Sequence, residues 1–292
     1  MEFKKVKETA KKIKEMEIQG AVQIALAAEK ALEDFIFYSK AETRTELLSD
    51  LKKAGKILKS SRPTAVALPN AVDRFIEKVE ETDIEDIDDL KRETLEIGSK
   101  IINNTKEAFE NITKIGASLI KNEQIIFTHC HSSTVNSILK YAFNHGKKFE
   151  VICTETRPFG QGFITARELS EAGIPVTLIV DSAVMQNMEK VDLVLVGADT
   201  ITKENKLINK IGTSQIALIA KHFDIPFYSA AQILKFTDKK AEDIELEERG
   251  EEEILEGRKL PDVNVRNVVF DITEPEYITG IITEEGIKNK SS

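Results

Sequence analysis

The stretch IIFTHCHSSTVNSILKYAF, residues 125–143, joins two patterns that belong to different secondary structures. It begins with the apolar run IIF, which favours a buried strand. The residues NSILKYAF that close it have the three- and four-residue apolar spacing of a helix. Where the strand passes into the helix, Cys130 lies between His129 and His131. The stretch therefore predicts a strand–helix unit with a thiol at its turn.

The same alternation continues through the second half of the chain. From residue 121 onward, short apolar runs rich in β-branched residues are separated by helical segments. The runs are IIFTHC, FEVICT, VTLIVD, LVLVGAD, PFYSAA and NVVFDIT. Nearly continuous apolar strands between helices indicate a mostly parallel sheet that is covered on both faces. We therefore predict a Rossmann-like α/β domain over residues 121–292, with the acid-rich residues 238–262 as an exposed insertion.

The first part of the chain, residues 1–120, has helical patterns only. The segment GAVQIALAAEKALEDF predicts one helix, and residues 84–119 predict a longer one. Between them, SSRPTAVALPN contains two prolines, Pro63 and Pro69, which mark a turn or a helix start. The fold class is thus α/β, with a helical N-terminal domain over residues 1–120 followed by the Rossmann-like domain. Two domains are also consistent with a length of 292 residues.

Charge and cysteine content restrict the partners and the compartment. The chain has 41 Lys and Arg against 50 Asp and Glu, a net charge of −9. This balance argues against binding of nucleic acid or an anionic membrane, both of which need a positive surface. Two cysteines do not make a disulfide framework, so we expect a cytoplasmic protein. The charged N-terminus does not have the pattern of a signal peptide, and we expect no membrane span.

The residues that follow the predicted strands form a chemically coherent set. Ligands of open parallel sheets bind beyond the carboxyl ends of the strands, and parallel strands bring these ends to one rim. A thiol, several carboxylates and two cations occupy these positions. They are Cys130, Glu155, Arg157, Asp181, Asp199 and Lys235.

Cys130 has three possible roles. A metal site would need more convergent ligands, and neighbouring side chains on a strand point to opposite faces. Because no Cys-x-x-Cys or His-x-x-x-His pattern accompanies Cys130, we predict no metal. A buried structural thiol is the second possibility, and we assign that role to Cys153, which lies inside an apolar strand. Cys130 instead precedes a helix, whose N-terminus would lower the thiol pKa and favour a thiolate that takes a proton from carbon.

Asp199 follows the buried run LVLV and the pair Gly197-Ala198. A carboxylate in this place is costly unless it is bonded or functional. It could cap a helix, but KEN at residues 203–205 predicts a turn, so we expect no helix directly after Asp199. We therefore favour a functional carboxylate.

Several short motifs could together hold a phosphate. Hydroxyls, N–H groups at helix starts and single cations are the usual parts of such a site. Taken one at a time, each residue has an ordinary alternative as a cap, a surface ion pair or a solvated cation. The candidates are Arg62, Ser132, Ser133, Thr134, Asn209 and Lys210.

Five of these motifs together resemble a known protein family. THCHSS, TETRPFGQG, VGADTIT, NKIGTSQIAL and AAQILKF occur in this order, with MEIQGA and SRPTAVALPN in the helical part. They are similar to the family that joins sugar-phosphate isomerases to the alpha, beta and delta subunits of translation initiation factor 2B. The resemblance covers nearly the whole chain.

The resemblance implies an activity and assigns residues to it. It is strongest to archaeal members that convert ribose 1,5-bisphosphate to ribulose 1,5-bisphosphate during nucleoside monophosphate degradation. It implies Cys130 and Asp199 as catalytic residues, no metal or organic cofactor, and a homo-oligomer, either a dimer or a hexamer. The implied substrate contacts are Gly20, Ala21, Arg62, Ser132, Ser133, Asn209, Lys210 and Lys235.

One departure from the family pattern leaves alternatives open. Isomerases of the family usually have arginine before the glycine of the GA motif, whereas this chain has Gln19. Glutamine can still contact a phosphate but carries no charge. The alternatives are an isomerase of methylthioribose 1-phosphate and a non-enzymatic regulatory subunit similar to factor 2B.

Overall fold

The structure is a computed structural model that describes residues 3–15, 17–18, 20–62 and 66–289. The chain divides into two compact units, Met1–Phe109 and Glu110–Ser292. The division falls within helix α5 (Ile87–Leu119), which ends close to the boundary predicted at residue 120. None of the helices in the described ranges is long and apolar enough to cross a membrane.

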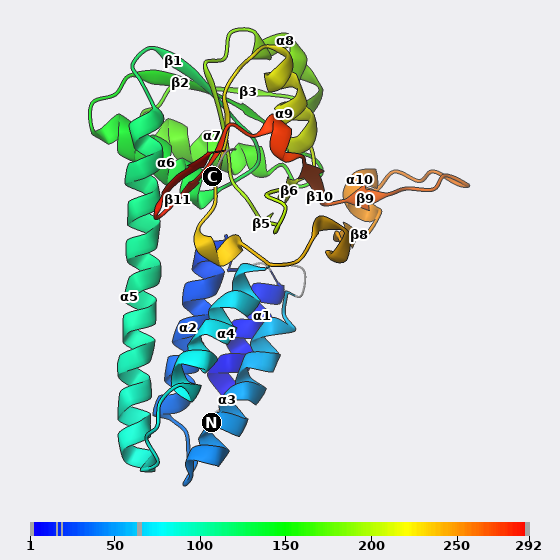
Figure 1. Ribbon diagram of the computed structural model, residues 1–292. Helices are drawn as coiled ribbons and strands as arrows, with labels where there is room; N and C mark the ends of the chain where they lie inside the picture. Colours follow the sequence, from blue (N-terminus) through cyan, green and yellow to red (C-terminus); the bar gives the residue numbers. More distant parts are fainter. Residues whose placement is uncertain (1–2, 16, 19, 63–65, 290–292) are drawn as a thin grey trace. The chain divides into compact units, whose positions relative to one another are not determined.

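The first unit is helical, as the apolar spacing predicts. Ile24, Leu32, Phe35, Val72 and Phe75 are among the apolar side chains that pack into its core. Both predicted helices are present, and Pro69 lies in the first turn of a third, where proline is tolerated. Apart from the start of α5, the helices are α1 (Lys4–Lys14), α2 (Ala21–Phe37), α3 (Arg44–Lys59) and α4 (Ala67–Glu80) (Figure 1).

A carboxylate is buried within this unit. Glu29 on α2 is fully buried and accepts a hydrogen bond of 2.7 Å from Arg74 on α4. Its oxygen Oε1 also lies 3.2 Å from Thr105 Oγ1 on α5, while Oε2 has no partner. Burial raises the pKa of Glu29 to about 7, and the charge of Arg74 opposes this rise only in part.

The buried carboxylate predicts a pH-dependent stability. Because the folded pKa lies above the unfolded value, the proton stabilises the fold at low pH, and this stabilisation is lost as pH rises through 7. Glu29→Gln removes the ionisation but keeps an acceptor for Arg74. Between pH 5 and pH 8 the free energy of unfolding of the wild type should fall by about 2.5 kcal/mol relative to that of this variant. Urea denaturation of both proteins at the two pH values measures the loss, and a constant difference would mean that Glu29 is ionised throughout.

The second unit is built on one large sheet. Its strands follow the order β12-β11-β7-β4-β1-β2-β3, and all neighbouring pairs are parallel except β11 with β12. The strands are β1 (Gln124–Thr128), β2 (Phe149–Thr154), β3 (Val176–Ile179), β4 (Leu193–Val196), β7 (Phe227–Ala230), β11 (Gly280–Thr283) and β12 (Gly286–Asn289). The predicted α/β class with a mostly parallel sheet is confirmed.

Alternate residues of the central strands fill two separate cores, one on each face of the sheet. Ile126 of β1 and Leu193 of β4 pack with α6 (Ser133–Asn144) and α7 (Gln161–Glu171). Their neighbours Phe127 and Val194 pack with α8 (Val184–Met188) and α9 (Thr213–His222). This double burial explains why the strands have no polar alternation. Figure 1 shows α6 and α7 lying together along the sheet.

The prediction for NVVFDIT is wrong in one respect. This run does not join the large sheet: it forms β9 (Asn267–Val268) and β10 (Phe270–Thr273), which belong to two smaller sheets. In those sheets β10 pairs antiparallel with β6 (Leu207–Lys210), and β9 pairs with β8 (Glu248–Arg249). The later run GIIT, as β11, takes the place in the large sheet. The apolar pattern marks both runs as strands, but it does not specify their partners.

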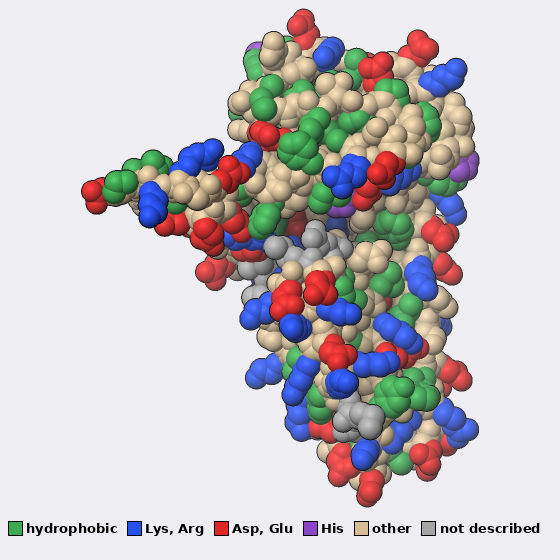
Figure 2. All heavy atoms as spheres, turned by 180° about the vertical axis from the view of Figure 1, so that it is seen from behind, with side chains coloured by type: hydrophobic (Ala, Val, Ile, Leu, Met, Phe, Trp, Pro, Cys, Tyr) green, Lys and Arg blue, Asp and Glu red, His purple; other side chains and the backbone are tan. Residues whose placement is uncertain are grey.

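The acid-rich residues 238–262 are mostly exposed, as predicted. They contain the short helix α10 (Glu252–Leu255) and the strand β8. Figure 2 shows a charged extension projecting from the second unit. Leu260 in the acid-rich stretch and Val263 just after it have exposed side chains.

Candidate active site

The sheet topology brings Cys130 and Asp199 to neighbouring positions. The chain runs from β1 outward to β2 and β3, then returns to the other side of β1 as β4. Beyond the carboxyl ends of β1 and β4 lies the switch point where open α/β sheets bind ligands. Cys130 follows β1, and Asp199 follows β4. Both are half-buried, and the carboxylate of Asp199 is close enough to act on the pKa of Cys130.

The loops that carry these two residues are in direct contact. A Cβ atom on Gly197 would lie 2.7 Å from Ser132 Oγ, so a larger residue would push the two loops apart. The carbonyl groups before Asp199 are held by buried side chains: Ser229 Oγ donates to Gly197 O at 2.9 Å, and Lys235 Nζ donates to Ala198 O at 2.6 Å. Asp199 is followed by strand β5 (Thr200–Ile201) and a turn, as predicted, so it does not cap a helix.

The prediction that the following helix lowers the pKa of Cys130 is wrong. Burial raises the pKa of the thiol to about 11. The charge of Lys210 lowers it, but Asp199 and Asp181 raise it further. The backbone N–H of His131, just before α6, also lowers the pKa, but burial outweighs it. Cys130 is therefore a neutral thiol at pH 7.

Hydrogen bonds connect the backbone of Cys130 to the loop after β6. The Cys130 N–H donates to Thr156 Oγ1 at 2.9 Å, and Thr156 Oγ1 lies 3.1 Å from Thr154 Oγ1. Thr154 Oγ1 lies 2.6 Å from His129 Nδ1, and His129 Nε2 lies 2.8 Å from Ile211 O. Since a carbonyl only accepts, Nε2 carries the proton and Nδ1 accepts from Thr154. In each of these four hydrogen bonds, the donor is therefore on the Cys130 side and the acceptor is on the Ile211 side.

His129 is not available to a metal. It is buried, and both of its ring nitrogens are occupied by the bonds just described. Burial lowers its pKa to about 4, so the ring stays neutral at physiological pH. Its role in the structure is to tie the end of β1 to the residues beside Lys210.

The NKIGT motif is arranged differently from the phosphate site that its sequence predicts. Gly212 N–H and Ser214 N–H both donate to the carboxylate of Asp271 on β10. This carboxylate closes the N-terminus of α9, so a phosphate there would meet a negative charge. Sequence reasoning missed Asp271, whose only signal is an acidic residue within the apolar run NVVFDIT.

Two residues of this motif are predicted to contact the substrate. Both lie beside the N-terminus of α9, which Asp271 caps. Asn209 is buried and donates to Thr213 Oγ1 at 3.0 Å. Lys210 is also buried, with its Nζ 5.3 Å from the ring centre of Phe270. Its charge is the largest influence that lowers the pKa of Cys130.

The start of α6 remains a candidate anion site. Ser132 caps this helix by accepting from Val135 N–H, Ser133 is half-buried in its first position, and Thr134 is buried. N–H groups in the first turn of a helix favour an anion. This turn begins three residues after Cys130 in the chain.

Arg157 and Asp181 have structural partners at the same rim. The guanidinium of Arg157 pairs with Glu256 of the acidic insertion. The carboxylate of Asp181 accepts from the N–H groups of Thr156 and Arg157 at 2.9 and 2.7 Å, and so holds the loop after β2. Substrate binding by Arg157 would require its guanidinium to leave Glu256.

The remaining predicted contacts lie in the first unit. Gly20 has φ 84° and precedes α2, which begins at Ala21. Arg62 is half-buried and follows α3, while Gln19 lies outside the described residues. Their part in the site stays a prediction.

The sequence of residues 17–290 matches the Initiation factor 2 subunit family. The chain belongs to this family. The resemblance predicted from the five motifs is therefore confirmed.

Relatives in the family are named for different functions. Ribose 1,5-bisphosphate isomerase of Methanocaldococcus jannaschii is 45% identical over 97% of this chain and 91% of its own length. The crystal structure of 5-methylthioribose 1-phosphate isomerase from Pyrococcus horikoshii OT3 matches with a TM-score of 0.83 and 37% identity, over 97% of this chain and 83% of that one. Translation initiation factor eIF-2B of the same organism matches with a TM-score of 0.83 and 30% identity, over 98% and 97%.

Proposed function

We propose that this protein is an aldose–ketose isomerase that converts ribose 1,5-bisphosphate to ribulose 1,5-bisphosphate. The observation that carries the proposal is the placement of a thiol and a carboxylate beyond adjacent strands at the switch point of the sheet. Isomerisation needs two proton-transfer groups with different environments, and Cys130 and Asp199 meet that need. Four archaeal relatives that share 42–45% identity are named ribose 1,5-bisphosphate isomerases, which supports the choice of substrate.

The chemistry divides between the two groups. Protonated Asp199 gives its proton to the ring oxygen, and the bond between C1 and that oxygen breaks. Cys130 acts in its thiolate form, a minor form at pH 7 that arises when the thiol loses its proton to solvent. The thiolate removes the proton from C2, which leaves an enol between C1 and C2. The thiol then returns a proton to C1, while Asp199 takes the proton of the C2 hydroxyl and a ketone forms. Each group ends in its initial state, and both phosphates stay in place.

A thiol with a raised pKa predicts that alkylation of Cys130 accelerates with pH. Only the thiolate can remove the C2 proton, and below its pKa the thiolate fraction rises tenfold per pH unit. Between pH 7 and pH 9, the rate at which iodoacetamide modifies Cys130 should therefore rise about 100-fold. Turnover does not isolate this effect, because the proposed reaction also needs a proton on Asp199 and the loss of that proton opposes the gain in thiolate. Mass spectrometry of the Cys130 peptide measures the rate of modification, and a flat profile would mean that the thiolate is already formed at pH 7.

Two groups of residues support phosphate binding in this proposal. The first turn of α6, with Ser132, Ser133 and Thr134, would hold a phosphate beside the thiol, and Lys210 and Lys235 would supply positive charge from the same rim. The second group, in the helical unit, comprises Gln19, Gly20, Ala21 and Arg62. Gln19 would donate a hydrogen bond where an arginine would add a charge.

A comparison of two substrates tests the proposal. Purified protein should turn over ribose 1,5-bisphosphate with a kcat/KM at least about 100-fold above that for methylthioribose 1-phosphate, because a site built for two phosphates loses a charged partner with the second substrate. The opposite preference would replace the proposed substrate. A folded protein that converts neither sugar would show that this chain is not an isomerase.

Methylthioribose 1-phosphate is the second candidate substrate because its isomerisation would use the same pair, Cys130 and Asp199. The 37% identity to the solved methylthioribose-1-phosphate isomerase also favours it. A regulatory role without catalysis is favoured by Gln19 but supported less well, because Cys130 and Asp199 are both present.

We further infer a cytoplasmic homo-oligomer that acts in nucleoside monophosphate degradation and needs neither metal nor organic cofactor. The acidic net charge and the two free cysteines support the compartment. Light scattering on the purified protein distinguishes a dimer from a hexamer, and a monomer would overturn the assembly.

A further inference from the structure

The backbone of Cys130 adopts a conformation that cysteine rarely takes. Its φ is 65°, in the left-handed region, where a side chain is strained by its own backbone. Such a residue persists when surrounding groups hold it. Here the peptide groups on both sides of its Cα are held: its N–H donates to Thr156 Oγ1 at 2.9 Å, and its carbonyl accepts from Thr165 Oγ1 at 2.9 Å.

The bond from Thr165 has a defined direction. A carbonyl only accepts, so the Thr165 hydroxyl donates to Cys130 O and must accept from its other neighbour. That neighbour is His131 Nδ1, 3.2 Å away, which therefore carries a proton. Asn136 Nδ2, at 3.5 Å from the same nitrogen, then faces a donor and makes no bond with it. The imidazole orients the threonine hydroxyl toward Cys130.

Charged side chains on two helices surround the imidazole. Glu168 on α7 lies with Oε1 3.7 Å from His131 Nε2, and its Oε2 accepts from Lys140 and Asn136 on α6 at 2.9 and 3.1 Å. Burial works against the charge of Glu168, yet the bonds from Lys140 and Asn136 hold its pKa below the usual value. The network therefore joins α6 to α7 on the side of the Cys130 carbonyl.

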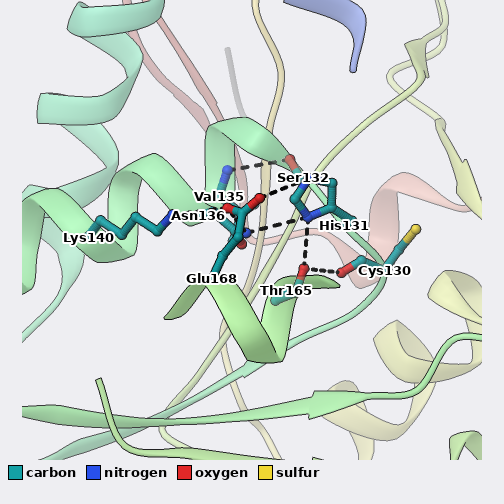
Figure 3. Close-up of polar contacts among 8 residues, drawn as sticks. All are labelled: Cys130, His131, Ser132, Val135, Asn136, Lys140, Thr165 and Glu168. Atoms are coloured by element: carbon teal, nitrogen blue, oxygen red, sulfur yellow. Dashed lines mark hydrogen bonds and ion pairs between the residues drawn. The ribbon is translucent and has the colours of Figure 1, made fainter. Parts of the chain in front are cut away.

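Figure 3 shows that the thiol is not part of this network. The hydroxyl of Thr165 meets the Cys130 carbonyl, whereas the sulfur points away from Thr165, His131 and Glu168. The backbone N–H of His131 acts on the thiol directly, whereas the side chains of Thr165, His131 and Glu168 affect it only through the backbone that carries it.

Helix α7 can bring Thr165 this close because of a glycine in its first turn. A Cβ atom on Gly162 would lie 1.7 Å from the backbone oxygen of Thr154 at the end of β2. The Gly162 N–H also donates to Glu155 O at 3.0 Å. Only glycine allows the helix to start against the strand, and Thr165 then stands one turn further along.

We infer that Thr165 is a positioning residue that holds Cys130 in its left-handed conformation, with its hydroxyl oriented by His131 and Glu168. The inference rests on the proposed function, because it concerns the orientation of a catalytic thiol toward its substrate. Without the bond, Cys130 relaxes toward an ordinary conformation and its side chain swings away from the C2 position of the sugar.

Thr165→Val tests this role because valine has nearly the same shape but no hydroxyl. We expect kcat to fall between about 10- and 100-fold with KM within about twofold, since the buried Thr165 hydroxyl bonds the backbone of Cys130. Thr165→Ser restores the hydroxyl and should recover kcat. Thr94→Val is the matched control: Thr94 is also buried and donates to a carbonyl, Leu90 O at 2.7 Å, but on α5 of the first unit.

Alkylation of the cysteines provides a readout that does not need activity. At pH 8 iodoacetamide should modify Cys130 at least about tenfold faster in Thr165→Val, because the released thiol is less buried and its pKa falls. Cys153, fully buried in β2, reports unfolding of the same unit and should react at the wild-type rate. Mass spectrometry of the two peptides separates the sites.

The outcomes separate the inference from the proposed function. A Cys130 alkylation rate in Thr165→Val within twofold of the wild type would overturn the positioning role. Faster alkylation of both cysteines would also overturn it, because the hydroxyl would then stabilise the unit as a whole. The third outcome is that Thr165→Val speeds the alkylation of Cys130 alone, while the wild-type protein converts no sugar phosphate. This outcome would support the positioning role of Thr165 and reject the proposed isomerase activity.

Discussion

Replacing Cys130 by serine should reduce turnover of ribose 1,5-bisphosphate by at least about 1,000-fold. Serine keeps the size of the side chain and leaves both backbone bonds of residue 130 in place. Its hydroxyl, however, is a far weaker acid than a thiol, so the alkoxide that would have to remove the C2 proton is almost never formed. The loss should appear in kcat, with KM nearly unchanged.

The second cysteine supplies the control for this substitution. Cys153 is buried in β2, and burial raises its pKa to about 12. Cys153→Ala removes a thiol from the same unit but from the packed sheet, so it should cost stability and leave kcat within about threefold. Residual activity above a tenth of the wild type in Cys130→Ser would remove Cys130 from the proton transfer.

Asp199→Asn should lower kcat by about 100- to 1,000-fold. The amide keeps the shape and can donate a hydrogen bond, but it cannot give a proton to the ring oxygen or take one from the C2 hydroxyl. Ring opening then becomes the slow step. Pre-steady-state mixing should show that the variant binds the sugar and accumulates no open-chain product.

Asp192 is a matched control at the other end of the same strand. It precedes β4, is exposed, and accepts from Ile125 N–H through its carboxylate, so Asp192→Asn makes the same chemical change away from the carboxyl ends. Its kcat should stay within about twofold of the wild type. Equal losses in both variants would assign the effect of Asp199 to the fold of the strand and not to the reaction.

The sequence predicts the layout of the large sheet well because its strands are buried on both faces. Residues such as Ile126 and Phe127 enter separate cores, so the apolar run is nearly continuous and easily recognised. Strand partners are not encoded in the same local way. NVVFDIT has the pattern of a central strand, yet the pairing of Phe270 with Lys210 places it in another sheet.

The candidate site is predictable only to the level of strand ends. Parallel topology brings Cys130 and Asp199 together, and their positions after apolar runs are visible in the sequence. The electrostatics of the site cannot be read from the sequence, because the pKa of Cys130 depends on burial and on Lys210, which is 80 residues away in the chain. Asp271 closes α9 from a different strand, and Thr165 reaches Cys130 from a different helix. Contacts of this kind depend on tertiary packing.

The most direct test is carbon NMR of ribose 1,5-bisphosphate labelled with carbon-13 at C1, incubated with the wild-type protein and with Cys130→Ala. The account predicts that the signal of C1 changes from an anomeric methine to a phosphorylated methylene with the wild type, and stays unchanged with the variant. An unchanged anomeric signal with the folded wild type, or conversion that persists without the thiol, would contradict it.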